Sequence, residues 1–205
     1  MPVERLNPDE RRRRLILEAS RLFGSRGYDG TSLDDVAHAD GVRKQTLLYH
    51  FPNKDSLFNA CIDELASRLA ATLRNGLMQP AEGWERVESV IRSIFRLAEE
   101  WPEFPLLARE ATRHSPQVVE RVAAKLEPLR KRAIVFLGRE MREGRFRTQD
   151  PGLLVFTLYG AVVGSLTEAG VLRVVTGEDS SSIALHQREE ELIEFVRRAL
   201  VPADE

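Results

Sequence analysis

Apolar residues recur along this chain at intervals of three and four, which is the spacing of one face of an α-helix. The pattern begins with Leu15, Ala19 and Leu22 and returns in segments up to the C-terminus, with glycine and proline residues between the segments. No segment alternates apolar and polar residues as a half-buried strand does, and the sequence has no internal repeat. The pattern predicts an all-α fold of about nine helices.

The signals for helix starts are clear in the first quarter of the chain. Asn7 can cap a first helix whose opening residue is Pro8, and Thr31 or Ser32 can cap a second, short helix. Asp40-Gly41 is typical of a tight turn, a third short helix follows it to Phe51, and Asn53 can cap a fourth. A short helix, a glycine turn and another short helix over residues 32–51 predict a helix-turn-helix.

Beyond residue 54 the helical pattern continues without a recognisable motif. We expect helices over residues 84–100, 106–113, 118–143, 151–175 and 183–200, a loop at 177–182, and a kink or break at Pro128. The chain therefore divides into a helix-turn-helix domain at residues 1–53 and a C-terminal domain at residues 54–205.

The third helix, in the stretch GVRKQTLLYHF, presents an unusual mixture of side chains. Leu47 and Phe51 lie four residues apart and, with Val42, face a core. The outer surface then carries side chains that can donate to guanine, pair with adenine or touch a thymine methyl: Arg43, Lys44, Gln45, Thr46 and Leu48. A solvated polar face would look similar, but the capped helix and glycine turn before it favour a recognition helix in the major groove of DNA.

The run from Ala19 to Phe58 resembles the N-terminal domain of the tetracycline-repressor (TetR) family of transcription regulators. The matching pieces are ASRLFGSRGYDGTSLDDVAHADGV and TLLYHFPNKDSLF, which are highly specific in combination. They cover about 40 of the 205 residues. The resemblance implies a ligand-responsive repressor that binds DNA as a dimer.

The family pattern also implies roles by position. It places base readers at Lys44, Gln45 and Thr46, with Arg43 and Leu48 beside them. Many family members carry serine or threonine at position 43 and tyrosine at position 48, so this chain gains a cation and loses a hydroxyl. We expect an apolar contact from Leu48, for example with a thymine methyl. The implied phosphate contacts are Thr31, Tyr49, His50 and Lys54.

Four consecutive arginines, at positions 11–14, open the first helix. A basic segment near DNA neutralises phosphates and makes binding sensitive to salt. The same arginines could instead form a solvated face paired with Asp9, Glu10 and Glu18. The sequence leaves both interpretations open.

The amino-acid composition excludes few classes of protein. Charged residues make up 30% of the chain and apolar residues 42%, an ordinary globular mixture, and the formal net charge of −2 predicts no nucleic-acid partner by itself. The single cysteine, Cys61, excludes an internal disulfide and favours a cytoplasmic location. We expect no secretion signal, because the N-terminal stretch MPVERLNPDERRRR is polar and lacks an apolar core. We expect no membrane association, because the most apolar segment, residues 153–175, contains Glu168 and Arg173.

An enzymatic role is not expected. The four histidines are scattered, and no nucleophile elbow, Walker loop or dinucleotide fingerprint is present. Cys61 lies on an apolar helix face and is interpreted as a core residue. Glu110 and His114 lie four residues apart, but two ligands are too few for a metal site and an ion pair is favoured. We expect no cofactor and no metal.

The C-terminal helices are expected to supply the dimer interface and a ligand pocket. Small residues permit close helix approach, and with the last helix they predict a four-helix bundle between two subunits, the candidates being Gly160, Gly164, Leu192, Phe195 and Val196. Ordinary packing within one chain is the alternative. Aromatic side chains are the candidates for lining the pocket: Trp84, Phe95, Trp101, Phe104, Phe136, Phe156 and Tyr159.

Together these features predict a repressor that an apolar or aromatic effector releases from a palindromic operator. Two other functions remain open: a DNA-binding protein without a small-molecule ligand, and a helical interaction module that has lost DNA binding.

Overall fold

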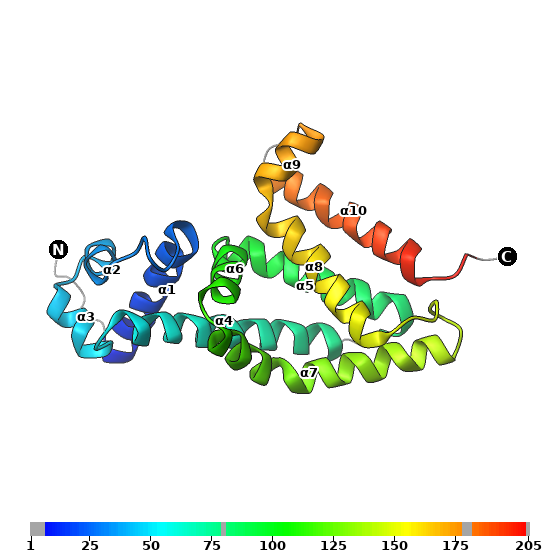
Figure 1. Cartoon of the computed structure of the whole chain (residues 1–205), viewed down its shortest axis with the longest axis horizontal. Coiled ribbons are helices and arrows are strands. Elements are labelled where there is room, and N and C mark those ends of the chain that lie inside the picture. The colour runs from blue at the N-terminus through cyan, green and yellow to red at the C-terminus, as the bar shows by residue number, and fades with distance from the viewer. Residues whose placement is uncertain (1–6, 79–80, 178–181, 204–205) are drawn as a thin grey trace. The chain divides into compact units, whose positions relative to one another are not determined.

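The structure is a computed structural model that describes residues 7–78, 81–177 and 182–203. These residues form ten helices and no strand (Figure 1). This confirms the predicted all-α class, with one helix more than expected. The helices are α1 Pro8–Arg26, α2 Leu33–Asp40, α3 Lys44–His50, α4 Lys54–Met78, α5 Gly83–Glu100, α6 Phe104–His114, α7 Pro116–Arg142, α8 Pro151–Thr167, α9 Ala169–Thr176 and α10 Ser182–Leu200.

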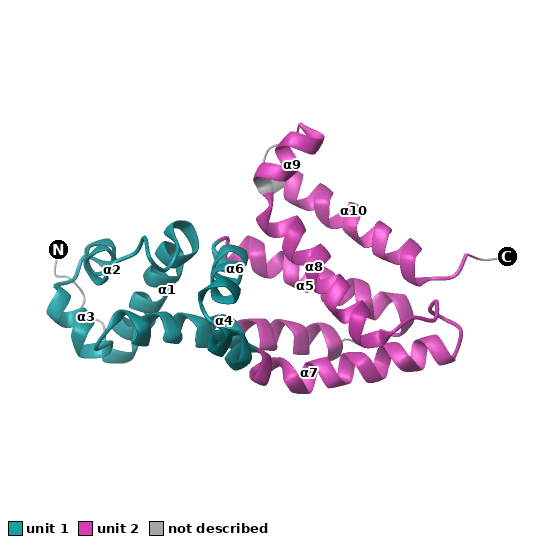
Figure 2. Cartoon of the chain, in the orientation of Figure 1, with its two compact units in different colours: residues 1–67, 103–122 teal, residues 68–102, 123–205 magenta. Residues whose placement is uncertain are grey.

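The chain forms two compact units (Figure 2). Unit 1 comprises residues 1–67 and 103–122, and unit 2 comprises residues 68–102 and 123–205. The division falls inside α4 and α7, so α6 belongs to the same unit as the helix-turn-helix. The predicted boundary at residue 53 separates a DNA-binding domain from a domain with other roles, whereas the two units are defined by packing. That boundary remains a prediction.

The helix starts of unit 1 follow from local capping. The Asn7 side chain accepts from the backbone N–H of Glu10 at 2.9 Å, and the Glu10 carboxylate accepts from the backbone N–H of Asn7 at 3.0 Å. Asn53 likewise accepts from the backbone N–H of Ser56 at 2.8 Å. Each cap satisfies N–H groups that have no partner within the helix. The predicted starts of α1 and α4 are confirmed.

Aromatic rings join four segments of unit 1. The Phe58 ring of α4 lies 5.0 Å from those of Phe23 in α1 and Tyr28 in the following turn, measured between centroids. The His114 ring, at the end of α6, lies 4.1 Å from the Tyr28 ring and 4.6 Å from the Phe58 ring. Edge-to-face pairs at such distances add to the stabilisation from burial. The cluster anchors α6 to the helices that carry the helix-turn-helix.

Unit 2 has its own apolar core, which α5, α7, α8 and α10 line. Phe95, Leu137 and Leu200 are among its most buried members. At the end of α7 the fully buried Glu140 carboxylate accepts from Arg139 and Arg145. Hydrogen bonding by Arg145, and then by Arg139, lowers the pKa of Glu140 although its desolvation opposes this.

Two expectations for the later helices need correction, and a third cannot be compared. The helix predicted to reach residue 175 ends at Thr167, where Glu168 has φ −95° and ψ 45° and α9 begins. The sequence there is weak in helix formers, since Thr167 and Gly170 flank the break. Pro128 does not break α7, which runs through it. Most of the loop predicted at residues 177–182 lies outside the described residues.

Among the described residues, no single helix is both long and apolar enough to cross a membrane. The helix pair α8 and α9 would meet the length and composition criteria jointly, but it is bent by 84°.

Candidate nucleic-acid interface

Helix α2 begins at a side-chain cap and ends at the glycine that turns the chain towards α3. The Ser32 hydroxyl accepts from the backbone N–H of Asp35 at 3.1 Å, and the Asp35 carboxylate accepts from the backbone N–H of Ser32 at 2.8 Å. The Ser32 hydroxyl also donates to the Asp35 carboxylate, and this bond, followed by the bond from the backbone N–H of Ser32, lowers the pKa of Asp35. Gly41 ends α2 in the left-handed conformation, with φ 70° and ψ 30°, where a side chain would be strained. The predicted helix, glycine turn and helix are therefore present.

Helix α3 is divided between a buried side and an exposed side, as predicted. Leu47 and Phe51 are buried. Leu48 is 37% exposed and Tyr49 is 81% exposed, so both project from the unit. Of the remaining predicted base readers, Arg43, Lys44 and Gln45 are exposed and Thr46 is partly exposed. An exposed set of polar side chains at a helix N-terminus has the form that base reading requires.

One base-reader candidate already has a partner. The Lys44 ammonium lies 2.6 Å from the Asp34 carboxylate of α2, an ion pair between the two helices of the motif. Arg43, at the N-cap of α3, makes no side-chain capping bond. The side chain at position 43, where many family members carry serine or threonine, therefore does not cap α3.

The predicted phosphate contacts lie in different environments. Tyr49 is exposed and His50 partly exposed, with their rings 5.1 Å apart. The Lys54 ammonium lies 4.1 Å from the centre of the Tyr28 ring. The Thr31 side chain is buried, and its hydroxyl donates to the carbonyl of Gly27 at 2.9 Å. The hydroxyl of Thr31 is therefore directed inward, and its phosphate contact remains a prediction.

The four arginines have separate contacts. The Asp40 carboxylate, which is fully buried, accepts from Arg11 and Arg14, both at 2.9 Å. The Arg12 guanidinium lies 5.1 Å from the centre of the Phe51 ring. Arg13 is exposed. Sequence reasoning weighed nearby acids on the first helix and missed Asp40, because nothing in a helical pattern shows which residue 26 or 29 positions away will be adjacent.

The aromatic residues predicted to line a ligand pocket do not gather around one cavity. Phe95 and Trp101 are core residues of unit 2, whereas Phe104 is a core residue of unit 1. Trp84 and Phe136 are partly buried and pack against the core of unit 2. The other two, on α8, are exposed: Phe156 by 70% and Tyr159 by 51%.

The residues predicted for a dimer interface fall into two groups. Leu192 and Val196 are buried within the core of unit 2. Phe195 is 67% exposed, and a Cβ added to Gly160 or Gly164 would meet no atom within 4 Å. The exposed group lies on α8 and α10, with Leu153, Phe156 and Tyr159 also exposed on α8.

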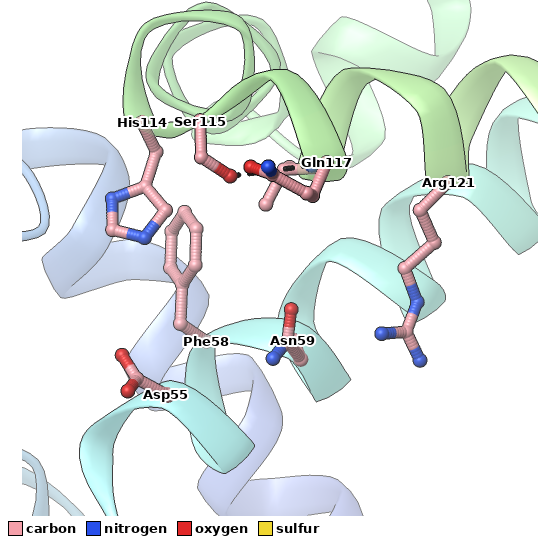
Figure 3. Close-up of a pocket in the computed structure, with 8 residues that line it drawn as sticks. Asp55, Phe58, Asn59, His114, Ser115, Gln117 and Arg121 are labelled. Carbon is pink, nitrogen blue, oxygen red and sulfur yellow. Dashed lines mark hydrogen bonds between the residues drawn. The ribbon is translucent and has the colours of Figure 1, made fainter.

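A hollow of unit 1, with a volume of about 390 Å³, has a polar lining (Figure 3). Asp55 and Asn59 of α4 lie across from His114 and Arg121 of the α6–α7 region. The Arg121 guanidinium forms a bidentate pair with Asp63, at 2.8 and 2.9 Å. None of the predicted pocket aromatics lines this hollow.

The candidates for catalysis or metal binding have structural contacts. The Cys61 thiol is buried, which raises its pKa to about 12, and it donates to the carbonyl of Ile16. Glu110 accepts from the backbone N–H of Tyr28 at 2.6 Å, and the ring of His114 packs on Tyr28, so the ion pair favoured between Glu110 and His114 does not describe their contacts.

A second group of possible metal ligands, His186, Glu189 and Glu190, was missed, although its spacing of three and four is visible in the sequence. Arg92 donates to Glu190 at 2.6 and 3.1 Å, and this hydrogen bonding lowers the pKa of Glu190. The positive charge of Arg92 therefore already neutralises part of the negative charge of Glu189 and Glu190.

Comparisons with known proteins identify the same helix-turn-helix region. Residues 15–61 match the family described as "Bacterial regulatory proteins, tetR family". The transcriptional activator FasR of Mycolicibacterium smegmatis is 32% identical over 95 residues, which cover 46% of this chain and 43% of FasR. The chain thus matches less than half the length of that relative. The transcriptional regulator RutR of Escherichia coli is 22% identical over 168 residues, covering 82% of this chain and 79% of RutR.

Solved structures share the whole fold. AibR, in a complex with isovaleryl coenzyme A and operator DNA, superposes with a TM-score of 0.74 at 20% identity, over 91% of this chain and 97% of AibR. The specific match lies in α1–α4, where the capped helices, the Gly41 turn and the exposed α3 surface occur together. Residues 15–61 of this chain therefore carry the N-terminal domain that is characteristic of the TetR family of bacterial regulatory proteins.

Proposed function

We propose that this protein is a DNA-binding transcriptional regulator that acts as a homodimer. The observation that carries the proposal is the α3 surface, where Arg43, Lys44 and Gln45 are exposed beside Tyr49 on a helix seated by Leu47. Two such helices would enter successive major grooves about 34–36 Å apart. The site residues are those expected from the sequence, with Arg43, Lys44, Gln45, Thr46 and Leu48 on bases and Thr31, Tyr49, His50 and Lys54 on phosphates.

The dimer is supported by the exposed apolar surface on α8 and α10. Phe156, Tyr159 and Phe195 are large side chains that remain more than half exposed in the single chain, and Gly160 and Gly164 would permit close approach of a second copy. Exposed apolar area of this kind marks interaction surfaces. Residues 1–53 would then bind DNA, and residues 54–205 would form the dimer and bind the effector.

A small-molecule effector that releases the protein from a palindromic operator completes the proposal. AibR, a structure of the same fold, is described as a complex with both isovaleryl coenzyme A and operator DNA. A coupling free energy of about 1–3 kcal/mol between effector and DNA is usual for such regulators. The protein would work in the cytoplasm and would have no catalytic activity.

Selection of bound duplexes from a random pool tests DNA binding first. We expect a palindromic site with two half-sites. Against that site Gln45→Ala should lose roughly 1–3 kcal/mol of binding free energy at one base pair, whereas Lys54→Ala should weaken binding to all sequences and reduce the salt slope. Lys54→Arg is the matched control, because it keeps the charge over the Tyr28 ring.

Two outcomes would contradict parts of this proposal. Uniform loss of affinity in both variants would mean that Gln45 is not a base reader. Equal operator affinity with and without every compound of a metabolite panel would leave a DNA-binding protein without an effector. Leu48→Tyr should change sequence preference and not stability, since Leu48 is already exposed.

A further inference from the structure

A second hollow, of about 310 Å³, lies on the surface of unit 2 between the start of α5 and the second half of α7. Ligand sites in proteins begin at about this size. Its lining combines four cations with two apolar side chains: Arg86, Lys131, Arg132, Arg139, Val135 and Phe136.

The positive charge of this hollow is only partly compensated. Lys131 shares the Glu127 carboxylate with Arg130, and Arg139 shares Glu140 with Arg145. Each of these two carboxylates therefore serves two cations. Within the described chain, Arg86 and Arg132 have no carboxylate partner.

The Arg86 side chain packs on an aromatic ring, but one of its hydrogen-bond donors has no acceptor in the part of the chain that the structure describes. Its guanidinium lies 5.2 Å from the centre of the Phe136 ring, and that of Arg139 lies 5.7 Å from the same ring. The Nε atom of Arg86 is buried and has no hydrogen-bond partner among the described residues. A buried donor without an acceptor is costly, so the Arg86 guanidinium beside the hollow keeps hydrogen-bonding capacity that the described residues do not use.

The apolar part of the lining limits what kind of anion would fit. Val135 is 69% exposed although it lies beside the partly buried Phe136. An inorganic ion would leave this apolar surface in water, whereas a ligand with an apolar body would cover it and gain free energy in proportion to the area buried.

We propose that this hollow binds a small organic anion, a carboxylate or phosphate joined to an apolar or aromatic body. Arg86, Arg132 and Arg139 hold the charged group, and Phe136 and Val135 contact the body. The inference names a chemical class for the effector and rests on the proposed function in that respect alone. Binding itself requires no DNA.

Titration of the full-length protein with phenyl phosphate and benzoate tests the proposal, with the methyl resonances of Val135 as the readout. We expect saturable shifts at Val135 and none at Val36, a buried residue of unit 1. Inorganic phosphate and benzyl alcohol each lack one half of the ligand and should bind at least about 10-fold more weakly. Arg86→Gln/Arg132→Gln should weaken phenyl phosphate at least about 10-fold.

Arg197→Gln on α10 is the matched control, since this arginine is exposed and lies outside the hollow. Arg132→Gln alone serves if the double variant does not fold, because Arg132 is also exposed. Equal binding by the variant and the wild type would overturn the proposal, as would unmoved Val135 resonances. Shifts caused only by a nonspecific DNA duplex or by anionic vesicles would also overturn it. Loss of operator binding with retained anion binding would instead contradict the proposed function alone.

Discussion

Unit 1 and unit 2 each contain a fully buried carboxylate between two arginines, but the two clusters hold different parts of the fold. Asp40 ends α2 and accepts from Arg11 and Arg14 of α1, which lie 29 and 26 residues away in the sequence. Glu140 lies in the last turn of α7 and accepts from Arg139 and Arg145, one and five residues away. The same chemistry joins two helices in unit 1 and stabilises a helix end in unit 2.

The distance in sequence between each carboxylate and its arginines determines which part of the fold the carboxylate stabilises. Loss of the Asp40 contacts would remove the ion pairs that join α2 to α1, and α3 follows α2 directly in the chain. Loss of the Glu140 contacts would affect the last turn of α7 and the residues after it, where the backbone N–H groups of Arg145 and Phe146 bond to the carbonyl of Glu140 in any case. A long-range cluster should therefore contribute more to global stability than a local one.

Asp40→Ala should have the largest effect. It removes two charge-assisted hydrogen bonds, and Arg11, whose side chain is only 20% exposed, would lose its partner. We expect the free energy of unfolding to fall by about 2–3 kcal/mol, as measured by urea denaturation. Glu194→Ala, which removes an exposed pair with Arg198, is the control and should change it by less than about 0.5 kcal/mol.

Glu140→Gln should have a smaller effect. Its two arginines are each nearly half exposed, so water can replace part of what they lose. We expect a loss of about 1–2 kcal/mol in the same denaturation experiment. A loss equal to that of Asp40→Ala would contradict the comparison, because sequence separation would then not matter.

The pH dependence of the Glu140 contribution provides a further test. The pKa of Glu140 is lowered below its ordinary value of 4.5, chiefly by the hydrogen bond from Arg145. A depressed folded-state pKa stabilises the protein above the unfolded-state value, and this stabilisation is lost as pH falls through the folded-state value. The difference in unfolding free energy between wild type and Glu140→Gln should therefore be constant above about pH 5 and shrink below pH 4.5. A difference that grows on acidification would exclude this origin.

Local signals allowed much of unit 1 to be predicted. Asn7, Ser32 and Asn53 cap helices by contacts with residues three positions away, so the sequence alone contains both partners. The Asp40-Gly41 turn and the inward side of α3, Leu47 and Phe51, follow from spacing. The exposure of Leu48 follows in turn, because Leu47 already occupies the inward position.

The remaining features depend on contacts that spacing does not encode. The partner of Arg11 and Arg14 is one example, and the packing of His114 on Tyr28 is another. Aromatic spacing also could not distinguish Phe95, which is buried, from Phe156, which is exposed. The cationic hollow joins residue 86 to residues 131–139, so it becomes visible only when α5 and α7 are folded together.

The smallest expected changes in the free energy of unfolding come from single arginines of α1. Arg14 is 53% exposed and pairs with Asp40, so Arg14→Gln should lower the free energy of unfolding by about 0.5–1 kcal/mol. In the Asp40→Ala background that loss should vanish, which a double-mutant cycle measures.

Arg13 is exposed and, within the described residues, forms no ion pair, so Arg13→Gln should leave stability within about 0.5 kcal/mol of wild type. Its charge is then available to DNA, and under the proposed function Arg13→Gln should reduce the salt slope of operator binding by roughly one. Arg14→Gln should leave that slope unchanged. A slope that falls equally in both variants would mean that Arg14 leaves Asp40 when DNA binds, and the cluster of unit 1 would then be part of the interface as well as of the fold.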